Sequence, residues 1–215
     1  MLLDILIPTI PARSRYLLNL LECLAPQLTR ADIGLLILSD DGTLEIGEKR
    51  NRLLEMARAD YVCFIDDDDL VSPNYVSALS GALQSSPDCV GFKMRRFYDQ
   101  IEIGEGINSI KCGSYRNEGH TFYRTPGHLN PIRRELAVQI GFEPISRHED
   151  MIFAERIFPL LKTEVFIDEH LYEYWYRSPR KRQEEEPYVF GGAPVPLNEI
   201  LHPSAEGSTS LIKME

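Results

Sequence analysis

The chain is poor in cysteine, in tryptophan and in long apolar runs. Its 215 residues include four cysteines and one tryptophan. The cysteines show no CxxC spacing, so we expect reduced, buried thiols rather than a zinc site or a disulfide framework. No run of about 18 apolar residues occurs, and the N-terminal apolar segment is too short and too interrupted for a signal peptide. We therefore expect a cytoplasmic protein with no membrane span.

Positive charge is also scarce. Lysine and arginine number 23 against 33 aspartates and glutamates, which gives a net charge of −10 and a pI near 5.0. This balance disfavours a protein held on nucleic acid or on an anionic membrane by charge alone, although it is compatible with a local basic patch. Hydrophobic residues make up 43% of the chain, as in globular domains, and the length favours a single core.

Apolar runs typical of buried strands alternate with segments of helical periodicity. The expected strands are 2–7, 33–38, 61–65, 89–94 and 171–176, and the expected helices are 15–25, 47–59, 73–83, 131–140 and 149–161. This order predicts an α/β fold with a mostly parallel sheet covered by helices on both faces. Ser14 and Ser72 are the expected N-caps of two of these helices, with Pro73 at the first helical position.

Two segments lack this alternation. Residues 95–127 have no clean period and predict an irregular or antiparallel excursion near the site. Residues 177–215 are rich in charge, Pro, Gly and Ser, and are too poor in apolar residues to form a core. We expect one domain over 1–176 and an extended or disordered tail over 177–215.

Polar residues follow three of the expected parallel strands at the point where each ends. They are Pro8-Thr9, Asp40-Asp41 and the run Asp66–Asp69. Because ligands of open α/β sheets bind at the carboxyl ends of the strands, these segments are expected to converge on one crevice.

The run Asp66–Asp69 requires neutralisation. Like charges at ~4 Å repel by about 4 kcal/mol at a dielectric constant near 20. Mg²⁺ or Mn²⁺ prefers oxygen ligands, and Asp66 and Asp68 point to the same side of an extended chain. A solvated loop in which Asp69 assists a helix cap is the alternative. A calcium EF-hand is excluded, since Pro73 and Leu79 stand where one starting at Asp68 needs glycine and glutamate.

Five segments resemble, in order and spacing, the motifs of family 2 glycosyltransferases with the GT-A fold. The run Tyr61–Pro73 is similar to the strand and D-x-D-D segment of that family. Asp4–Thr9 resembles its first strand and Pro-Thr loop, Ser39–Gly42 its D-D-G turn, and Gly47–Asn51 its G-x-x-R-N helix start. Asn130–Asp150 resembles the segment leading to its E-D motif. The resemblance covers about residues 3–176.

The resemblance implies an inverting, Mn²⁺- or Mg²⁺-dependent transfer of a sugar from a nucleotide-sugar to a hydroxyl acceptor, with a UDP-sugar as the expected donor. It assigns Asp68, with Asp66, to the metal, and Asp150 of the pair Glu149-Asp150 to the catalytic base. It assigns the donor to Pro8, Thr9, Asp40, Asp41, Lys49, Arg50, Asn51, Asp66 and Asp67. His128 and His148 flank the acceptor-side motifs and are candidates for acceptor binding, with packing or solvent exposure as the alternative.

The acceptor and the class of function keep alternatives. A glycan and a hydroxymethylated DNA base are both candidate acceptors. Basic and aromatic groups able to contact nucleic acid come from the pairs Tyr115-Arg116, Tyr123-Arg124 and Arg133-Arg134. A nucleotidyltransferase would need a Gly-rich N-terminal loop, which Pro8–Pro11 does not supply. A GT-A-like module that binds a nucleotide without turnover is the non-enzymatic alternative.

Overall fold

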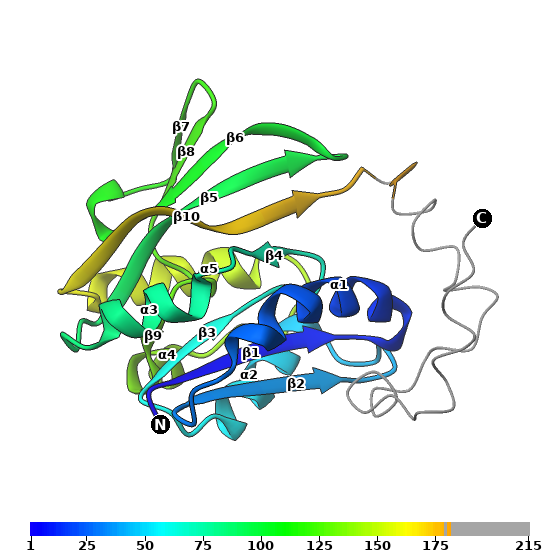
Figure 1. The fold of residues 1–215 in the computed structure, drawn as a ribbon, viewed down its shortest axis with the longest axis horizontal. Helices are drawn as coiled ribbons and strands as arrows, with labels where there is room; N and C mark the ends of the chain where they lie inside the picture. The colour runs from blue at the N-terminus through cyan, green and yellow to red at the C-terminus, as the bar shows by residue number, and fades with distance from the viewer. Residues whose placement is uncertain (179, 182–215) are drawn as a thin grey trace.

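A ten-stranded mixed sheet with helices on both faces forms the protein in the computed structural model, which describes residues 1–178, 180 and 181 (Figure 1). Its parallel core consists of β2 (Ile33–Ser39), β1 (Leu3–Thr9) and β3 (Tyr61–Phe64), with β1 in the centre. The α/β class and the mostly parallel core expected from the sequence are confirmed.

The other half of the sheet is largely antiparallel. Its path continues from β3 through β9 (Ile132–Arg133), β5 (Cys89–Tyr98), β6 (Ile101–Asn108) and β8 (Thr121–Arg124) to β7 (Arg116–Glu118). The long strand β10 (Glu164–Tyr176) pairs in parallel with β5 and in antiparallel with β4 (Leu70–Val71). The segment 95–127 is therefore the antiparallel excursion expected from the sequence, and Figure 1 shows it rising above the parallel core.

Helices cover the two faces of the sheet and enclose two apolar clusters. The first cluster includes residues of α1 (Ser14–Leu24) and α3 (Tyr75–Leu83), and the second includes residues of α2 (Ile46–Met56), α4 (Arg134–Ile140) and α5 (Glu149–Ile157). Strand β1 supplies both, with Leu3, Ile5 and Ile7 in the first and Leu6 in the second. Successive side chains of a strand point to opposite faces, so a continuous apolar run serves two cores.

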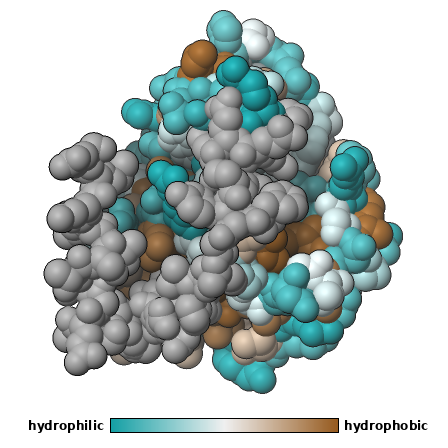
Figure 2. Space-filling view, turned by 90° about the vertical axis from the view of Figure 1, so that its right-hand side faces the viewer, coloured by the Kyte–Doolittle hydropathy of each residue, from teal (hydrophilic) through white to brown (hydrophobic). Residues whose placement is uncertain are grey.

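Four 3₁₀ helices complete the described elements: η1 (Pro11–Arg13), η2 (Ala25–Gln27), η3 (Ile110–Cys112) and η4 (Phe158–Leu160). None of the described helices combines the length and apolar character that a membrane span requires. On the face drawn in Figure 2, hydrophobic residues show as separate patches among hydrophilic ones.

Several predicted boundaries are wrong. Ser72 is not an N-cap: α3 begins at Tyr75, and the Ser72 hydroxyl donates to the side chain of Asn74 instead. Helix α1 begins at Ser14 itself, so Ser14 is not its cap. The expected helix 131–140 opens with strand β9, and the last strand begins at Glu164, seven residues before the predicted start at 171. Of the predicted tail, residues 179 and 182–215 lie outside the described residues.

Asp4 is a buried carboxylate inside β1, and its partners are backbone groups. It accepts hydrogen bonds from the amides of Arg58 at 2.7 Å and Ala59 at 2.8 Å. It thereby fixes the turn between α2 and β3. Gly34 of β2 lies directly beside it, since a Cβ at Gly34 would come within 2.1 Å of an Asp4 oxygen.

We expect Asp4→Ala to lower the free energy of unfolding by about 3 kcal/mol, because two buried amides lose a charged acceptor. Urea unfolding of the variant measures this. Asp60→Ala serves as the control, because Asp60 is exposed and precedes β3. Equal losses in the two variants would contradict a structural role for the Asp4 carboxylate.

Candidate active site

A cleft lies at the carboxyl edge of the parallel core and has a volume of about 400 Å³. The ends of β1 and β3 and the start of α2 meet there, as the convergence of strand ends predicts. We call it the aspartate cleft; the residues that line it include Pro8, Thr9, Arg13, Lys49, Arg50, Asp66–Asp69, Glu149, Tyr174 and Trp175.

The four aspartates divide into an accessible pair and a buried pair. The side chains of Asp66 and Asp68 are 27% and 16% exposed, whereas that of Asp67 is 4% exposed and Asp69 is buried. The alternation agrees with the expectation that Asp66 and Asp68 share a side of the chain.

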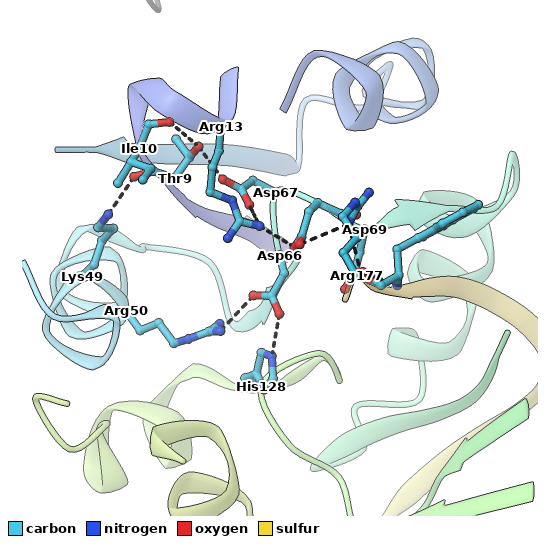
Figure 3. A network of polar contacts seen from close by, with 12 residues as sticks. Thr9, Ile10, Arg13, Lys49, Arg50, Asp66, Asp67, Asp69, His128 and Arg177 are labelled. Atoms are coloured by element: carbon cyan, nitrogen blue, oxygen red, sulfur yellow. Dashed lines mark hydrogen bonds and ion pairs between the residues drawn. The ribbon is translucent and has the colours of Figure 1, made fainter. Parts of the chain in front are cut away.

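Asp67 joins the aspartate run to the end of β1 and to η1. The Thr9 hydroxyl donates to Asp67 Oδ2 at 2.6 Å, and Arg13 Nη2 lies 2.7 Å from Asp67 Oδ1 (Figure 3). Burial raises the pKa of Asp67 to about 7, against the opposing effect of the Arg13 charge. Asp67, predicted as a donor contact, is thus engaged with the protein itself.

Asp69 joins the same run to β10. Its carboxyl group accepts from the Tyr172 hydroxyl at 2.8 Å and from the Trp175 amide at 2.7 Å. Burial, with the neighbouring charges of Asp68 and Asp66, raises its pKa well above the usual range. Asp67 and Asp69 therefore connect the segment after β3 to β1 and to β10. Asp66 and Asp68 remain facing the cleft.

Basic side chains surround the accessible pair. Asp66 Oδ1 lies 2.8 Å from Arg50 Nη2, and Asp66 Oδ2 lies 3.6 Å from His128 Nε2. Burial opposes ionisation of Asp66, but Arg50 and His128 outweigh it and hold its pKa well below the usual range. Asp68 lies 2.7 Å from Arg13 and 3.2 Å from Arg177. Figure 3 shows this network.

The N-terminal half of α2 carries two buried cations, Lys49 and Arg50. Lys49 donates to the carbonyl of Thr9 at 2.7 Å and forms an ion pair with Asp40. Arg50 lies over the rings of Phe64 and Phe142 and reaches Glu149 Oε1 at 3.4 Å. Burial opposes the charge of Arg50, yet Asp66 and Glu149 raise its pKa. A buried cation held in place in this way can act on an anionic ligand without reorganising.

Other predicted site residues lie away from the lining of the cleft. The Asn51 side chain bonds to both backbone groups of Phe142, and Asp41 is exposed and accepts from Thr43. Asp40 is bound to Lys49 and to the amides of Gly42 and Leu44. His148 is exposed, with a left-handed backbone (φ 67°) before α5.

A second pocket, of about 260 Å³, adjoins the cleft, and Tyr174 lines both. It contains two predicted residues, Asp150 and His128, together with Arg96 and Arg124. We call it the arginine pocket. Glu149 and Asp150 are neighbours in sequence, yet Glu149 lines the aspartate cleft and Asp150 the arginine pocket.

Sequence reasoning missed several residues of these two spaces. Arg13, Arg177, Tyr172 and Trp175 contact the aspartate run, although no spacing connects them to it. A signal was present for Tyr172 and Trp175, because the Tyr-Glu-Tyr-Trp run concentrates aromatic residues in one expected strand. The signal for Arg13 was weaker: it lies four residues after Thr9, close to the predicted strand end.

The accessible carboxylates fit a divalent cation that shares its ligands with a phosphate. Mg²⁺ commonly binds one or two carboxylates and takes its other ligands from substrate phosphates and water. Asp66 and Asp68 supply two such carboxylates. Among the described residues no group of three or more His, Cys, Asp or Glu side chains could hold a metal ion. Asp66 and Asp68 could thus supply part of the ligand set of such an ion.

The family model described as glycosyl transferase family 2 matches residues 25–141, more than half of the chain. The chain therefore belongs to this family. A search of the curated proteins found no match.

Solved structures of TarS from S. aureus are similar to this fold. The complex of TarS 1–349 with UDP-GlcNAc has a TM-score of 0.66 at 16% identity over 84% of this chain and 60% of the TarS chain. The complex with UDP has a TM-score of 0.65 at 17% identity over 97% and 71%. The chain spans 43% of the longer TarS chain, with a TM-score of 0.63 at 18% identity. These matches confirm the GT-A fold.

We expect Asp67→Asn to change how stability depends on pH. The folded pKa of Asp67, about 7, lies above the value of ~4 for an unfolded aspartate. Ionisation of this carboxyl therefore lowers the free energy of unfolding as the pH rises from about 4 to 7. Asparagine does not ionise, so the variant should gain up to about 4 kcal/mol relative to wild type over this range.

Urea unfolding in EDTA at several pH values between 4.5 and 7.5 measures the difference. Asp60→Asn, at an exposed position, should run parallel to wild type. Parallel curves for Asp67→Asn and wild type would show that Asp67 titrates normally.

Proposed function

We propose that the protein is a metal-dependent, inverting glycosyltransferase that moves a sugar from a nucleotide-sugar, with a UDP-sugar as the first candidate, to a hydroxyl acceptor. One observation carries the proposal. A cleft with two accessible aspartates and buried cations opens beside a pocket that contains a further carboxylate, Asp150. The diphosphate of a donor needs the cations of the cleft, and the hydroxyl of an acceptor needs a carboxylate that can take its proton. The acceptor is a glycan or a hydroxymethylated DNA base.

The donor side is the aspartate cleft. Asp66 and Asp68 would hold Mn²⁺ or Mg²⁺, which when bound supplies Lewis-acid stabilisation of the leaving diphosphate. Arg13 and Arg50 lie against these aspartates and would bind phosphate oxygens as charge develops there. The similarity to a protein crystallised with UDP-GlcNAc and with UDP supports a uridine nucleotide as the first donor to test.

The acceptor side is the arginine pocket. Inversion requires a base that takes the proton of the incoming hydroxyl on the face of the sugar opposite to the leaving group. Asp150 is suited to this, because it lines the pocket next to the cleft. Glu149, buried against Arg50, is suited to holding that arginine in place. Of the two residues predicted as catalytic, Asp150 is therefore the proposed base and Glu149 a positioning residue.

Release of the nucleotide from UDP-, GDP-, dTDP- and CMP-sugars, a diphosphate from the first three and CMP from the last, tests the donor and the metal in the presence of Mn²⁺, Mg²⁺ or EDTA. We expect slow hydrolysis of one donor that EDTA abolishes and that Asp68→Asn lowers about 100-fold or more. Asp60→Asn, at the opposite edge of the sheet, should leave it unchanged. Hydrolysis that is equal in EDTA would refute metal dependence. The absence of both hydrolysis and nucleotide binding would refute the transferase.

Asp150→Asn tests the base. We expect transfer to fall about 10²–10⁴-fold while binding of the donor, measured by calorimetry, stays within about twofold of wild type. Full transfer by the variant would remove Asp150 from the base role. Donor binding by the wild type without turnover on any acceptor would favour a non-catalytic nucleotide-binding module.

A further inference from the structure

The arginine pocket contains positive charge that the protein does not neutralise. Arg96 of β5 and Arg124 of β8 both line it. Within residues 1–178, 180 and 181, neither guanidinium forms an ion pair with a carboxylate. By contrast, Arg13 and Arg50 of the aspartate cleft pair with its aspartates, as does Arg177, which contacts Asp68. Asp150 is the one carboxylate among the described lining residues. The pocket is thus positive in a chain with a net charge of −10.

The Arg96 side chain is held in place across a neighbouring strand. Gly106 of β6 lies between β5 and β8, and a Cβ there would come within 2.6 Å of Met94 Cγ and 3.6 Å of Arg96 Cδ. The Arg96 side chain extends across β6, and its guanidinium carbon lies 3.3 Å from the ring centre of Phe122. Stacking on an aromatic ring orients the planar guanidinium and leaves its edge for hydrogen bonds.

Arg96 has donor capacity to spare. Its Nη1 atom is buried and has no hydrogen-bond partner among the described residues. Burial and the charge of Arg124 lower the pKa of Arg96, so the two cations oppose each other in this space. Arg124 lies near the rings of Phe122 and Tyr115, and its Nη1 donates to two backbone carbonyls. An anion in the pocket would relieve the repulsion and pair the buried donor.

We infer that the acceptor carries a phosphate group next to the hydroxyl that is glycosylated, and that Arg96 and Arg124 bind this phosphate. The inference rests on the proposed function for the identity of the bound molecule as the acceptor. Arginine matches the geometry of phosphate oxygens with two parallel hydrogen bonds. Asp150 lines the same pocket, so a phosphate held by the arginines brings its neighbouring hydroxyl to the proposed base.

The size and charge of the surroundings favour a small acceptor unit over DNA. The pocket, at about 260 Å³, is below the ~300–1,000 Å³ typical of drug-sized ligand sites, so it suits one sugar phosphate or polyol phosphate unit. Binding of duplex DNA depends on many phosphate contacts from an extended basic surface, and the net charge of −10 opposes this.

Binding of simple probes to the full chain tests the inference without turnover. Glucose 6-phosphate and glycerol 3-phosphate are compared with glucose and glycerol by calorimetry or ligand-observed NMR. We expect the phosphorylated probes to bind at least about tenfold more tightly than the neutral ones, and Arg96→Gln and Arg124→Gln to weaken them about tenfold each. Arg95→Gln is the matched control, since Arg95 is exposed and points to the other face of β5.

Arg96→Lys is the control for a folding defect in Arg96→Gln. It keeps the charge but not the paired donors, so it should bind with intermediate affinity. Equal binding of phosphorylated and neutral probes would overturn the inference, as would full binding by folded Arg96→Gln. A hydroxymethylated oligonucleotide that displaces the probes at lower concentration, in an Arg96-dependent manner, would overturn the preference for a small acceptor.

UDP binding measured on the same samples separates this inference from the proposed function. The arginine variants should bind UDP as wild type does. If the wild type does not bind UDP but binds phosphorylated probes in an Arg96-dependent manner, the transferase is refuted and the anion site is supported. UDP binding without any binding of the phosphorylated probes would refute only the phosphorylated acceptor.

Discussion

Neutralisation of four consecutive aspartates at the end of β3 is the constraint on which the rest of the site depends. Repulsion within this run is relieved by contacts from distant parts of the chain. Thr9 and Arg13 hold Asp67, while Tyr172 and Trp175 hold Asp69. Since these partners come from the end of β1, from η1 and from β10, the run connects the parallel core to the other half of the sheet. Asp66 and Asp68 are left at the cleft surface as a consequence.

Charge balance distinguishes the two spaces of the site. In the aspartate cleft each accessible carboxylate already has arginine partners, so a metal ion with a diphosphate would exchange one set of charges for another. In the arginine pocket, Arg96 and Arg124 have no such partner among the described residues. Tyr174 lines both spaces. A sugar passed between a donor and a phosphorylated acceptor would therefore cross from a compensated environment to a positive one.

Particular residues mark the limit of what could be predicted from the sequence. Thr9 is predicted at the cleft because parallel strands end at one edge of the sheet, and Arg50 because Gly47–Asn51 resembles the family's helix start. Asn51 follows Arg50 directly, but the helix rotates by about 100° per residue, and its side chain bonds to Phe142 instead. The local Ser-Pro signal at Ser72 also failed, because Ser72 bonds to Asn74 ahead of a helix that begins at Tyr75.

By itself the sequence determined the α/β order, the convergence of polar strand ends and the resemblance to family 2 glycosyltransferases. These features depend on local periodicity and on motifs of a few residues. Only the tertiary structure decided which aspartates are buried, which space each member of the pair Glu149-Asp150 lines, and that Arg96 stacks on Phe122 across Gly106. These outcomes depend on contacts between residues far apart along the chain, such as Asp69 with Trp175, and no local pattern specifies such partners.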